Sequence, residues 1–427
     1  MSEALRIGAL ESQLKGLLEK RRAKSTLRNL TLPAAGLVDF SSNDFLSLAT
    51  SSQLKDEFHE ELRSCDAPQG SGGSRLLDGN SIYAEELEHD IARFHGAEAG
   101  LLFNSGFDAN AGFFSCVPQP NDWIVYDEYV HASVHDGMRL SRAKGTLSFR
   151  HNSVQDLKEV LQKLTDTMAS SEHPVGNIIV AVESIYSMDG DVAPLRGIVD
   201  TVHNIVGHDR GYIVVDEAHS TGVLGSEGRG LVCQLGLERR ILARLHTFGK
   251  ALASNGAIIL GSSTLRHYLI NYARPLIYTT FLSYPSLALV RSSYALLWSG
   301  RTSLLQEHLQ HLTSALFVGL THLHATSQAA RSCLRIPSAC PQSPIFGVQL
   351  QQPRLMASFL QSQRMMVRAV VPPTVPLGTQ RVRICLHAGN TVLEIEELIR
   401  AIEWWCDGQM LEVRDEVTRK EETRPML

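Results

Sequence analysis

A lysine near the middle of the chain sits in a setting that favours chemistry on its amine. Lys250 follows the polar turn Thr247-Phe248-Gly249 and precedes the apolar run 257–260. Apolar surroundings disfavour the charged form and lower the pKa of a lysine, which makes the free amine a usable nucleophile or base. Considered alone, a surface lysine that caps a turn is the commoner case, so the interpretation depends on other residues.

Two further polar residues follow a predicted buried strand over 212–215, namely Asp216 and His219. A buried carboxylate at Asp216 could keep a heteroaromatic nitrogen protonated by direct charge pairing. Lys250, 34 residues further on, could hold the same ring covalently. Together they describe a pyridoxal phosphate site, in which the protonated pyridine accepts electrons from a substrate carbanion. The alternative is that Asp216 caps the next helix, the commoner role of a single aspartate.

Other candidate motifs are less specific. The loop 70–75 has Arg75 where a dinucleotide fingerprint needs glycine, so the dehydrogenase interpretation fails. His131 and His135 stand four residues apart, but they lack the glutamate of a metalloprotease motif and a third ligand, so we expect no metal. The segment 101–110 indicates a strand, a turn and a helix start whose backbone N–H groups could hold a phosphate.

The elements that must position these residues have the pattern of an α/β fold. Apolar runs at 123–126, 177–182 and 212–215 alternate with helical patterns such as 81–95 and 153–168. This alternation predicts a mostly parallel sheet covered on both faces, with polar residues at the carboxyl ends of the strands forming the site. We expect an N-terminal helical arm over 1–40, a large domain over 41–290, and a smaller C-terminal α+β domain over 291–427.

Composition excludes several classes of protein. The chain has 427 residues and a net charge of −5, without the basic block of a nucleic-acid surface. No apolar run approaches the roughly 18 residues of a membrane span. Seven scattered cysteines without a C-x-x-C pair argue against a disulfide framework and favour a reducing compartment. Glutamates in the first 24 residues argue against a signal peptide or presequence, which leaves a cytoplasmic protein as the expectation.

Taken in order, the motifs resemble the α-oxoamine synthase family of fold-type I pyridoxal phosphate enzymes. The resemblance runs from about residue 27 to 402 and is carried by S-N-D-F-L at 42–46, G-S-G-G-S-R at 70–75, N-S-G-F at 104–107, H-A-S at 131–133, S-M-D-G-D at 187–191, V-D-E-A-H at 215–219, T-F-G-K at 247–250 and P-P-T-V-P at 372–376. The last motif is most similar to members that join L-alanine to a pimeloyl thioester in biotin synthesis. The implied reaction is a decarboxylative condensation that releases carbon dioxide and a free thiol, such as coenzyme A or a carrier protein.

The resemblance also implies roles for particular residues. Lys250 would bind the cofactor and move the alanine Cα proton, Asp216 would pair with the ring nitrogen, and His131 would stack on the ring. The remaining cofactor contacts would come from Ser105, Gly106, Phe107 and Thr247 at the phosphate, from Ser187 and His219 at the phenolic oxygen, and from Thr279 or Thr280 of a second subunit. A homodimer with the active site at the subunit interface is therefore expected. Substrate would be held by Asn43 and Arg383 at its carboxylate and by Thr374 and Arg28 at the acyl chain.

Two rival functions remain open. A sister synthase would use another amino acid or another acyl-CoA, and a catalytically silent partner subunit would keep the fold for assembly. The C-terminal residues Pro425-Met426-Leu427 weakly resemble a peroxisomal tail, although Met426 replaces the basic residue of that signal.

Overall fold

The computed structural model describes residues 8–24, 26–30, 32, 35–170 and 176–422, with side chains described as far as residue 409. Contacts divide the chain into two compact units, Met1–Leu37 and Val38–Leu427, which are described separately. The first unit contains helix α1 (Ala9–Ala23), with Glu11 in its first turn and three basic residues in its last. These charges complement the helix dipole. The helix predicted near the N-terminus is therefore present, and its docking on the rest of the chain stays a prediction.

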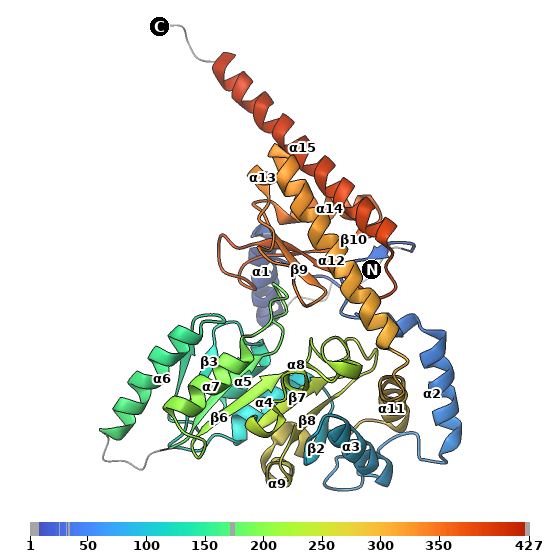
Figure 1. Cartoon of the computed structure of the whole chain (residues 1–427), viewed down its shortest axis with the longest axis vertical. Coiled ribbons are helices and arrows are strands. Elements are labelled where there is room, and N and C mark those ends of the chain that lie inside the picture. Colours follow the sequence, from blue (N-terminus) through green and yellow to red (C-terminus); the bar gives the residue numbers. More distant parts are fainter. Residues whose placement is uncertain (1–7, 25, 31, 33–34, 171–175, 423–427) are drawn as a thin grey trace. The chain divides into compact units, whose positions relative to one another are not determined.

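The second unit contains a seven-stranded sheet with the order β2-β8-β7-β6-β5-β3-β4. Strands β3 to β7 run parallel to their neighbours in this order, whereas β8 is antiparallel to both β7 and β2. The mostly parallel sheet predicted from the sequence is thus confirmed (Figure 1). Its strands are β2 (Ala99–Phe103), β3 (Trp123–Asp127), β4 (Gly145–Phe149), β5 (Ile178–Glu183), β6 (Gly211–Asp216), β7 (Ala243–Thr247) and β8 (Ala257–Gly261).

Both faces of this sheet are covered by helices, which explains why its central strands are continuous apolar runs. Alternate residues of one strand enter different cores: Val180 and Val182 of β5 pack in one, and Ile179 and Ala181 in the other. The helices on the first side are α3 (Ile82–Phe94), α6 (Val154–Ala169), α7 (Leu195–Ile205) and α11 (Tyr284–Trp298). Those on the second are α4 (Gly106–Cys116), α5 (Ala132–Arg139), α9 (Ser263–Tyr272) and α10 (Arg274–Ile277).

Several helices begin where side-chain chemistry predicts. Ser153 caps α6 by accepting the backbone N–H of Asp156, as its spacing indicates. Ser105 caps α4 in the same way, through the N–H of Asp108. Further helices and 3-10 turns of this unit are η1 (Leu48–Thr50), α2 (Ser52–Ser64), η2 (Ser226–Gly228), α8 (Leu231–Leu235) and η3 (Glu238–Arg240).

A smaller antiparallel sheet, with the order β11-β12-β9, forms in the C-terminal part of the chain. Strands β1 and β10 form a separate parallel pair, which joins residues Val38–Asp39 to Met365–Met366. The elements are β1 (Val38–Asp39), α12 (Ser303–Thr326), α13 (Gln328–Cys333), β9 (Ile345–Gln349), α14 (Pro353–Ser362), β10 (Met365–Met366), β11 (Arg368–Val370), β12 (Arg381–Cys385) and α15 (Val392–Glu422). The predicted three-part division at residues 40 and 290 stays a prediction.

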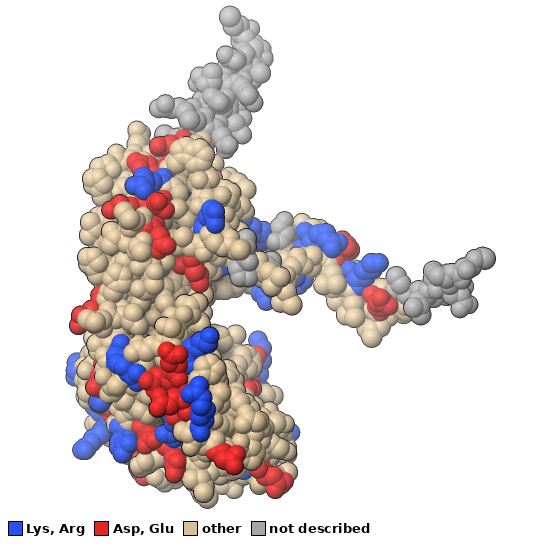
Figure 2. All heavy atoms as spheres, turned by 90° about the vertical axis from the view of Figure 1, so that its right-hand side faces the viewer, with Lys and Arg blue, Asp and Glu red and all other residues tan. Residues whose placement is uncertain are grey.

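Surface charge of both signs is mixed on the face shown in Figure 2. Among the ion pairs of the described residues, Arg301 pairs with Glu57, and Arg291 approaches Glu61 and Asp90. Neighbouring opposite charges cancel at distances beyond the Debye length, so this face presents no large field of one sign. Within the part of the chain that the structure describes, no helix is both long and apolar enough to cross a membrane.

Candidate active site

A cavity of about 360 Å³ opens at the carboxyl ends of strands β5, β6 and β7. Asp216 ends β6, Glu183 ends β5, and Lys250 follows β7 by three residues, and all three side chains line this cavity. Parallel strands place their carboxyl ends along one edge of a sheet, which brings together residues that are far apart in sequence. The volume lies within the range of small-molecule sites. The structure thus brings Lys250 and Asp216 to one cavity.

The electrostatics of the cavity favour an uncharged lysine amine. Burial lowers the pKa of Lys250, although the carboxylates of Asp216 and Glu183 work in the opposite direction. Burial and the nearby Asp216 raise the pKa of Glu183 well above its usual range. Glu183 therefore favours its protonated form, and the side chain of Asp216 beside it is positioned by hydrogen bonds.

A chain of hydrogen bonds connects Asp216 to His131. The amide of Asn110 donates to Asp216 Oδ2 at 2.8 Å and lies 3.1 Å from Ser133 Oγ, which in turn lies 2.8 Å from His131 Nδ1. Ala218 N–H donates to the other oxygen of Asp216 at 2.9 Å. Burial lowers the pKa of His131, which keeps its imidazole neutral. The carboxylate and the imidazole are therefore held in fixed positions on the wall of one cavity.

The other end of the cavity lies at the N-terminus of α4. Ser105, Gly106 and Phe107 line it, together with Thr247 at the end of β7. A Cβ atom on Gly106 would lie 2.4 Å from Thr247 Cγ2, so only glycine allows this approach of helix and strand. The free N–H groups and the dipole of a helix N-terminus favour a phosphate.

Several buried polar atoms of the cavity have no partner within the described part of the protein. They are Asn104 Oδ1, His219 Nδ1, Thr247 Oγ1 and Ser254 Oγ. Buried polar groups are nearly always hydrogen-bonded, so these atoms indicate a polar ligand. A ring with a phosphate at one end and a protonated nitrogen facing Asp216 matches this set of donors and acceptors. The residues present therefore fit pyridoxal phosphate.

The predicted carboxylate-binding pair is also assembled. Arg383 on β12 donates to Asn43 Oδ1 at 2.9 Å, and Asn43 lines the cavity. Arg383 also donates to the backbone carbonyl of Ser187 at 2.6 Å. The side chain of Ser187 lies in a second cavity of about 480 Å³, which includes Thr374 and shares His131 with the first. The cis bond Pro372–Pro373 precedes Thr374 in this wall.

Besides Arg383, three predicted residues line neither of these cavities. Thr279 and Thr280 do not line the first cavity, but both contact the amide of Asn104, which does. Their expected role is toward a second subunit, so it stays a prediction. Arg28 belongs to the N-terminal unit, which is described separately, and its role at the acyl chain also stays a prediction.

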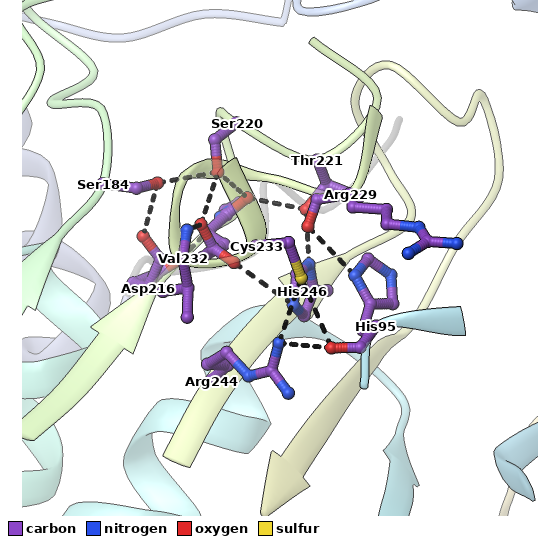
Figure 3. A network of polar contacts seen from close by, with 12 residues as sticks. His95, Ser184, Asp216, Ser220, Thr221, Arg229, Val232, Cys233, Arg244 and His246 are labelled. Carbon is purple, nitrogen blue, oxygen red and sulfur yellow. Dashed lines mark hydrogen bonds and ion pairs between the residues drawn. The ribbon is translucent and has the colours of Figure 1, made fainter. Parts of the chain in front are cut away.

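A buried polar network that sequence reasoning missed lies behind Asp216 (Figure 3). It includes Glu217 and His246, whose side chains are fully buried, with Oε2 and Nε2 3.5 Å apart. Neither of these two atoms has a hydrogen-bond partner within the described residues. The Thr221 hydroxyl donates to the Glu217 carbonyl at 2.7 Å, so it must accept the Nδ1–H of His246 at 2.8 Å.

The position of one proton in this network follows from that assignment. Burial lowers the pKa of His246 well below its usual range, so Nε2 of the neutral ring is an acceptor. Burial raises the pKa of Glu217 to about 7. Below that pH, the protonated Glu217 carboxyl faces His246 Nε2, and its other oxygen accepts Val232 N–H at 3.0 Å. The pair connects the loop after β6 to β7, the strand that leads to Lys250.

No local sequence signal distinguishes the residues of this network. Glu217 stands inside the V-D-E-A-H motif, but its spacing alone does not show that its partner is His246, 29 residues away. The ring of His95 packs against that of His246 at a tilt of 36°, with centroids 4.0 Å apart, and Arg244 donates to the His95 carbonyl at 2.7 Å. These contacts depend on the strand order of the sheet, which is a property of the folded chain.

Comparisons with known proteins agree with this arrangement. Residues 35–402 match the family described as aminotransferase class I and II. An 8-amino-7-oxononanoate synthase of Emericella nidulans is 50% identical over 398 residues, which are 93% of this chain and 96% of that protein. The aminoacyl transferase sphA of Aspergillus fumigatus is 38% identical over 94% of this chain and 88% of its own length. A solved serine palmitoyltransferase from S. paucimobilis with bound PLP and myriocin covers 95% of this chain and all of its own, with a TM-score of 0.80 and 24% identity.

The chain therefore belongs to the aminotransferase class I and II family, within which it is an α-oxoamine synthase. Its similarity to an 8-amino-7-oxononanoate synthase extends over nearly the whole of both chains. The fold expected from the sequence, a fold-type I α/β enzyme with a smaller C-terminal sheet, is confirmed.

Proposed function

We propose that this protein condenses L-alanine with a pimeloyl thioester to give 8-amino-7-oxononanoate, carbon dioxide and a free thiol. The observation that carries the proposal is the single cavity lined by Lys250, Asp216 and His131. The 50% identity to an 8-amino-7-oxononanoate synthase supports the choice of substrates. The cofactor is pyridoxal phosphate, which supplies a protonated ring that accepts the electron pair left at the amino-acid Cα.

Each residue of the cavity then has a defined task. Asp216 would hold the proton on the ring nitrogen of the bound cofactor, because Asn110 and Ala218 fix its two oxygens at the cavity wall. Lys250 would take the proton from the alanine Cα and later return one, which its lowered pKa permits. His131 would pack on the ring face as a neutral imidazole.

The substrate carboxylate is placed by Arg383 and Asn43. A guanidinium presents a planar fork that suits a carboxylate. The bond between Arg383 and Asn43 fixes both side chains before substrate arrives. The reaction later expels this carboxylate group as carbon dioxide. Arg383 and Asn43 therefore form a clamp on the group that leaves.

The second cavity is the proposed site of the acyl chain. His131 borders both cavities, so the thioester carbonyl can reach the alanine Cα. Apolar lining from Val130, Met188, Pro373 and Val375 suits the methylene groups of a pimeloyl chain and excludes water from them. Thr374 lies on the same wall.

A panel of amino acids against pimeloyl-, acetyl- and palmitoyl-CoA tests the proposal. We expect turnover to be highest with alanine and pimeloyl-CoA. The Lys250→Ala variant should lose turnover and the absorbance of the lysine-bound cofactor, whereas Lys55→Ala, an exposed lysine on α2, should keep both. Activity and absorbance that survive in Lys250→Ala would refute the role of this residue.

A second candidate function is a related condensation with another amino acid or acyl-CoA. The 38% identity to the aminoacyl transferase sphA over most of the chain favours this alternative. The same panel separates the two, because preferred turnover with palmitoyl-CoA or with serine would replace the first proposal by the second. A protein that binds no cofactor would instead be a silent partner subunit.

We also propose that the active form is a homodimer. Exposed apolar side chains gather on the segments that adjoin Asn104 at the mouth of the cavity: Leu76, Leu77, Ile82, Phe107 and Tyr278. The N–H of Phe281 donates to the carbonyl of Gly73, which joins the segment that contains Tyr278 to the segment that contains Leu76 and Leu77. A second copy would cover them and bring its Thr279 and Thr280 to the phosphate. A monomer by light scattering that retains full activity would contradict this.

For location we propose the cytoplasm, with peroxisomal import as the alternative outcome. The residues of the weak tail, 425–427, lie outside the described part of the chain. A fluorescently tagged protein should show the same distribution with and without these three residues. A shift from peroxisomes to cytoplasm after their removal would establish the alternative.

A further inference from the structure

Two cysteine side chains meet in the C-terminal part of the chain, away from both cavities. Cys333 is the last residue of α13, and Cys406 lies in α15, which packs against α13 (Figure 1). Their Sγ atoms are 3.2 Å apart. Cys406 is fully buried and Cys333 is partly exposed, so solvent reaches the pair from the side of Cys333.

We propose that this pair is a redox-modification site, at which a hydroperoxide converts the two thiols to a reversible disulfide. Both sulfurs are free thiols in the structure. A disulfide needs an S–S distance of about 2.05 Å, which requires a closing movement of about 1 Å between side chains that already touch. The proposal goes beyond the condensation reaction and does not depend on it.

The order of attack follows from the environment of each thiol. With both groups protonated, Cys333 donates its S–H to the sulfur of Cys406. Once Cys333 loses its proton, the S–H of Cys406 can stabilise the thiolate, which lowers the pKa of Cys333. The same hydrogen bond, together with burial, raises the pKa of Cys406. Cys333 is therefore the more readily deprotonated and also the more exposed sulfur, so it attacks peroxide first.

The two steps balance in atoms and electrons. Once Cys333 has lost its proton, its sulfur forms an S–O bond with one peroxide oxygen and the O–O bond breaks. The other oxygen takes up that proton and leaves as water from hydrogen peroxide, or as an alcohol from an organic hydroperoxide. The Cys406 sulfur then forms the S–S bond, the S–O bond breaks, and the departing oxygen leaves as water with the proton from Cys406. Two thiols lose two electrons in total, and one hydroperoxide is reduced.

The cross-link would enclose much of the smaller sheet. The chain between Cys333 and Cys406 contains β9, α14, β10, β11 and β12, and with them Thr374 and Arg383. A disulfide that closes a loop restricts the unfolded chain and stabilises the segments inside it. Oxidation should therefore make the substrate-binding part of this region more resistant to unfolding.

Thiol counting and mass spectrometry of the full-length enzyme test this proposal. After treatment with hydrogen peroxide, the seven free thiols should fall to five, and the mass should fall by that of two hydrogen atoms. A dithiol reductant should reverse both changes. Peptide mapping of the unmodified sequence should recover one linked peptide, containing Cys333 and Cys406.

Variants provide the matched comparison. In the Cys333→Ser and Cys406→Ser variants, peroxide should no longer cause the reversible loss of two thiols. In Cys340→Ser, which removes an exposed cysteine outside the pair, that loss should remain. A linked peptide that joins other cysteines, or oxygen addition without loss of two hydrogens, would overturn the proposal. Peptide mapping of the wild-type protein gives this answer even where a variant fails to fold.

Discussion

The protonation of Glu217 offers the sharpest test of the buried network behind Asp216. In the Glu217→Gln variant, the amide N–H group can face His246 Nε2 in the place of the protonated carboxyl, and the amide oxygen can accept Val232 N–H. We therefore expect glutamine to change the free energy of unfolding by less than about 1 kcal/mol at pH 4.5, where the carboxyl is protonated in the folded protein. Glu217→Ala removes both functions and leaves buried groups unpartnered, at a cost on the order of 3–5 kcal/mol.

The difference in the free energy of unfolding between wild type and Glu217→Gln should also change with pH, by an amount that follows from the pKa of Glu217. Because burial raises the folded pKa of Glu217 from 4.5 to about 7, the contribution of this group is fully present below pH 4.5 and is lost as pH rises through 7. The shift corresponds to about 3 kcal/mol. Glutamine does not titrate, so this variant should gain up to about 3 kcal/mol relative to wild type between pH 4.5 and pH 8.

Urea unfolding at several pH values, followed by tryptophan fluorescence, measures both effects. Glu60→Gln is the control, because Glu60 is exposed on α2 and its replacement should cause no comparable pH-dependent difference. If glutamine at position 217 costs as much as alanine at pH 4.5, the carboxyl is charged and our assignment of the proton is wrong. A pH-independent gap between wild type and Glu217→Gln would contradict it as well.

Three further predictions follow from contacts around the cavity. Gly106→Ala places a methyl group against Thr247, so cofactor affinity by absorbance titration should fall at least about tenfold, and an unchanged affinity would contradict the close approach. Asp216→Asn should reduce turnover by at least about 100-fold while the fold is kept; near-normal rates would remove its role. Hydrogen bonds to Asp127 and Asp191 outweigh burial and raise the pKa of His151 to about 10, so its stabilising effect is full below pH 6.5 and lost through pH 10. The stability lost in His151→Gln should therefore be larger at pH 6 than at pH 10.5 in thermal unfolding.

Local patterns in the sequence predict the elements well where the signal lies within a few residues. The apolar run over 177–182 becomes strand β5, which is buried along its length. Thr391 and Glu394 form the predicted capping box at the start of α15, with reciprocal bonds of 3.2 and 2.8 Å. In these cases, the hydrogen bonds or the burial are determined by neighbouring residues, so spacing is sufficient.

The site is predicted less completely because its geometry depends on strands that pair across the sheet. Lys250 and Asp216 stand beside strands that are neighbours in the sheet, and their positions after apolar runs mark them as candidates that the family resemblance then connects. Glu183 also ends a strand, yet its neutral state arises only from burial beside Asp216. Asn110 lies in the interior of α4, and its bond to Asp216 joins residues more than a hundred positions apart.

The pairing of β1 with β10 has a consequence for how the enzyme is made. Val38 and Asp39 leave the ribosome early, but their partners Met365 and Met366 follow roughly 330 residues later. At bacterial or eukaryotic rates of about 5–20 residues per second, that interval is on the order of 20–60 seconds. During this time Asn43 lacks the guanidinium of Arg383 that will hold it. The proposed substrate clamp is therefore completed among the last steps of synthesis, and a nascent chain interrupted before residue 383 cannot form the bond between Arg383 and Asn43.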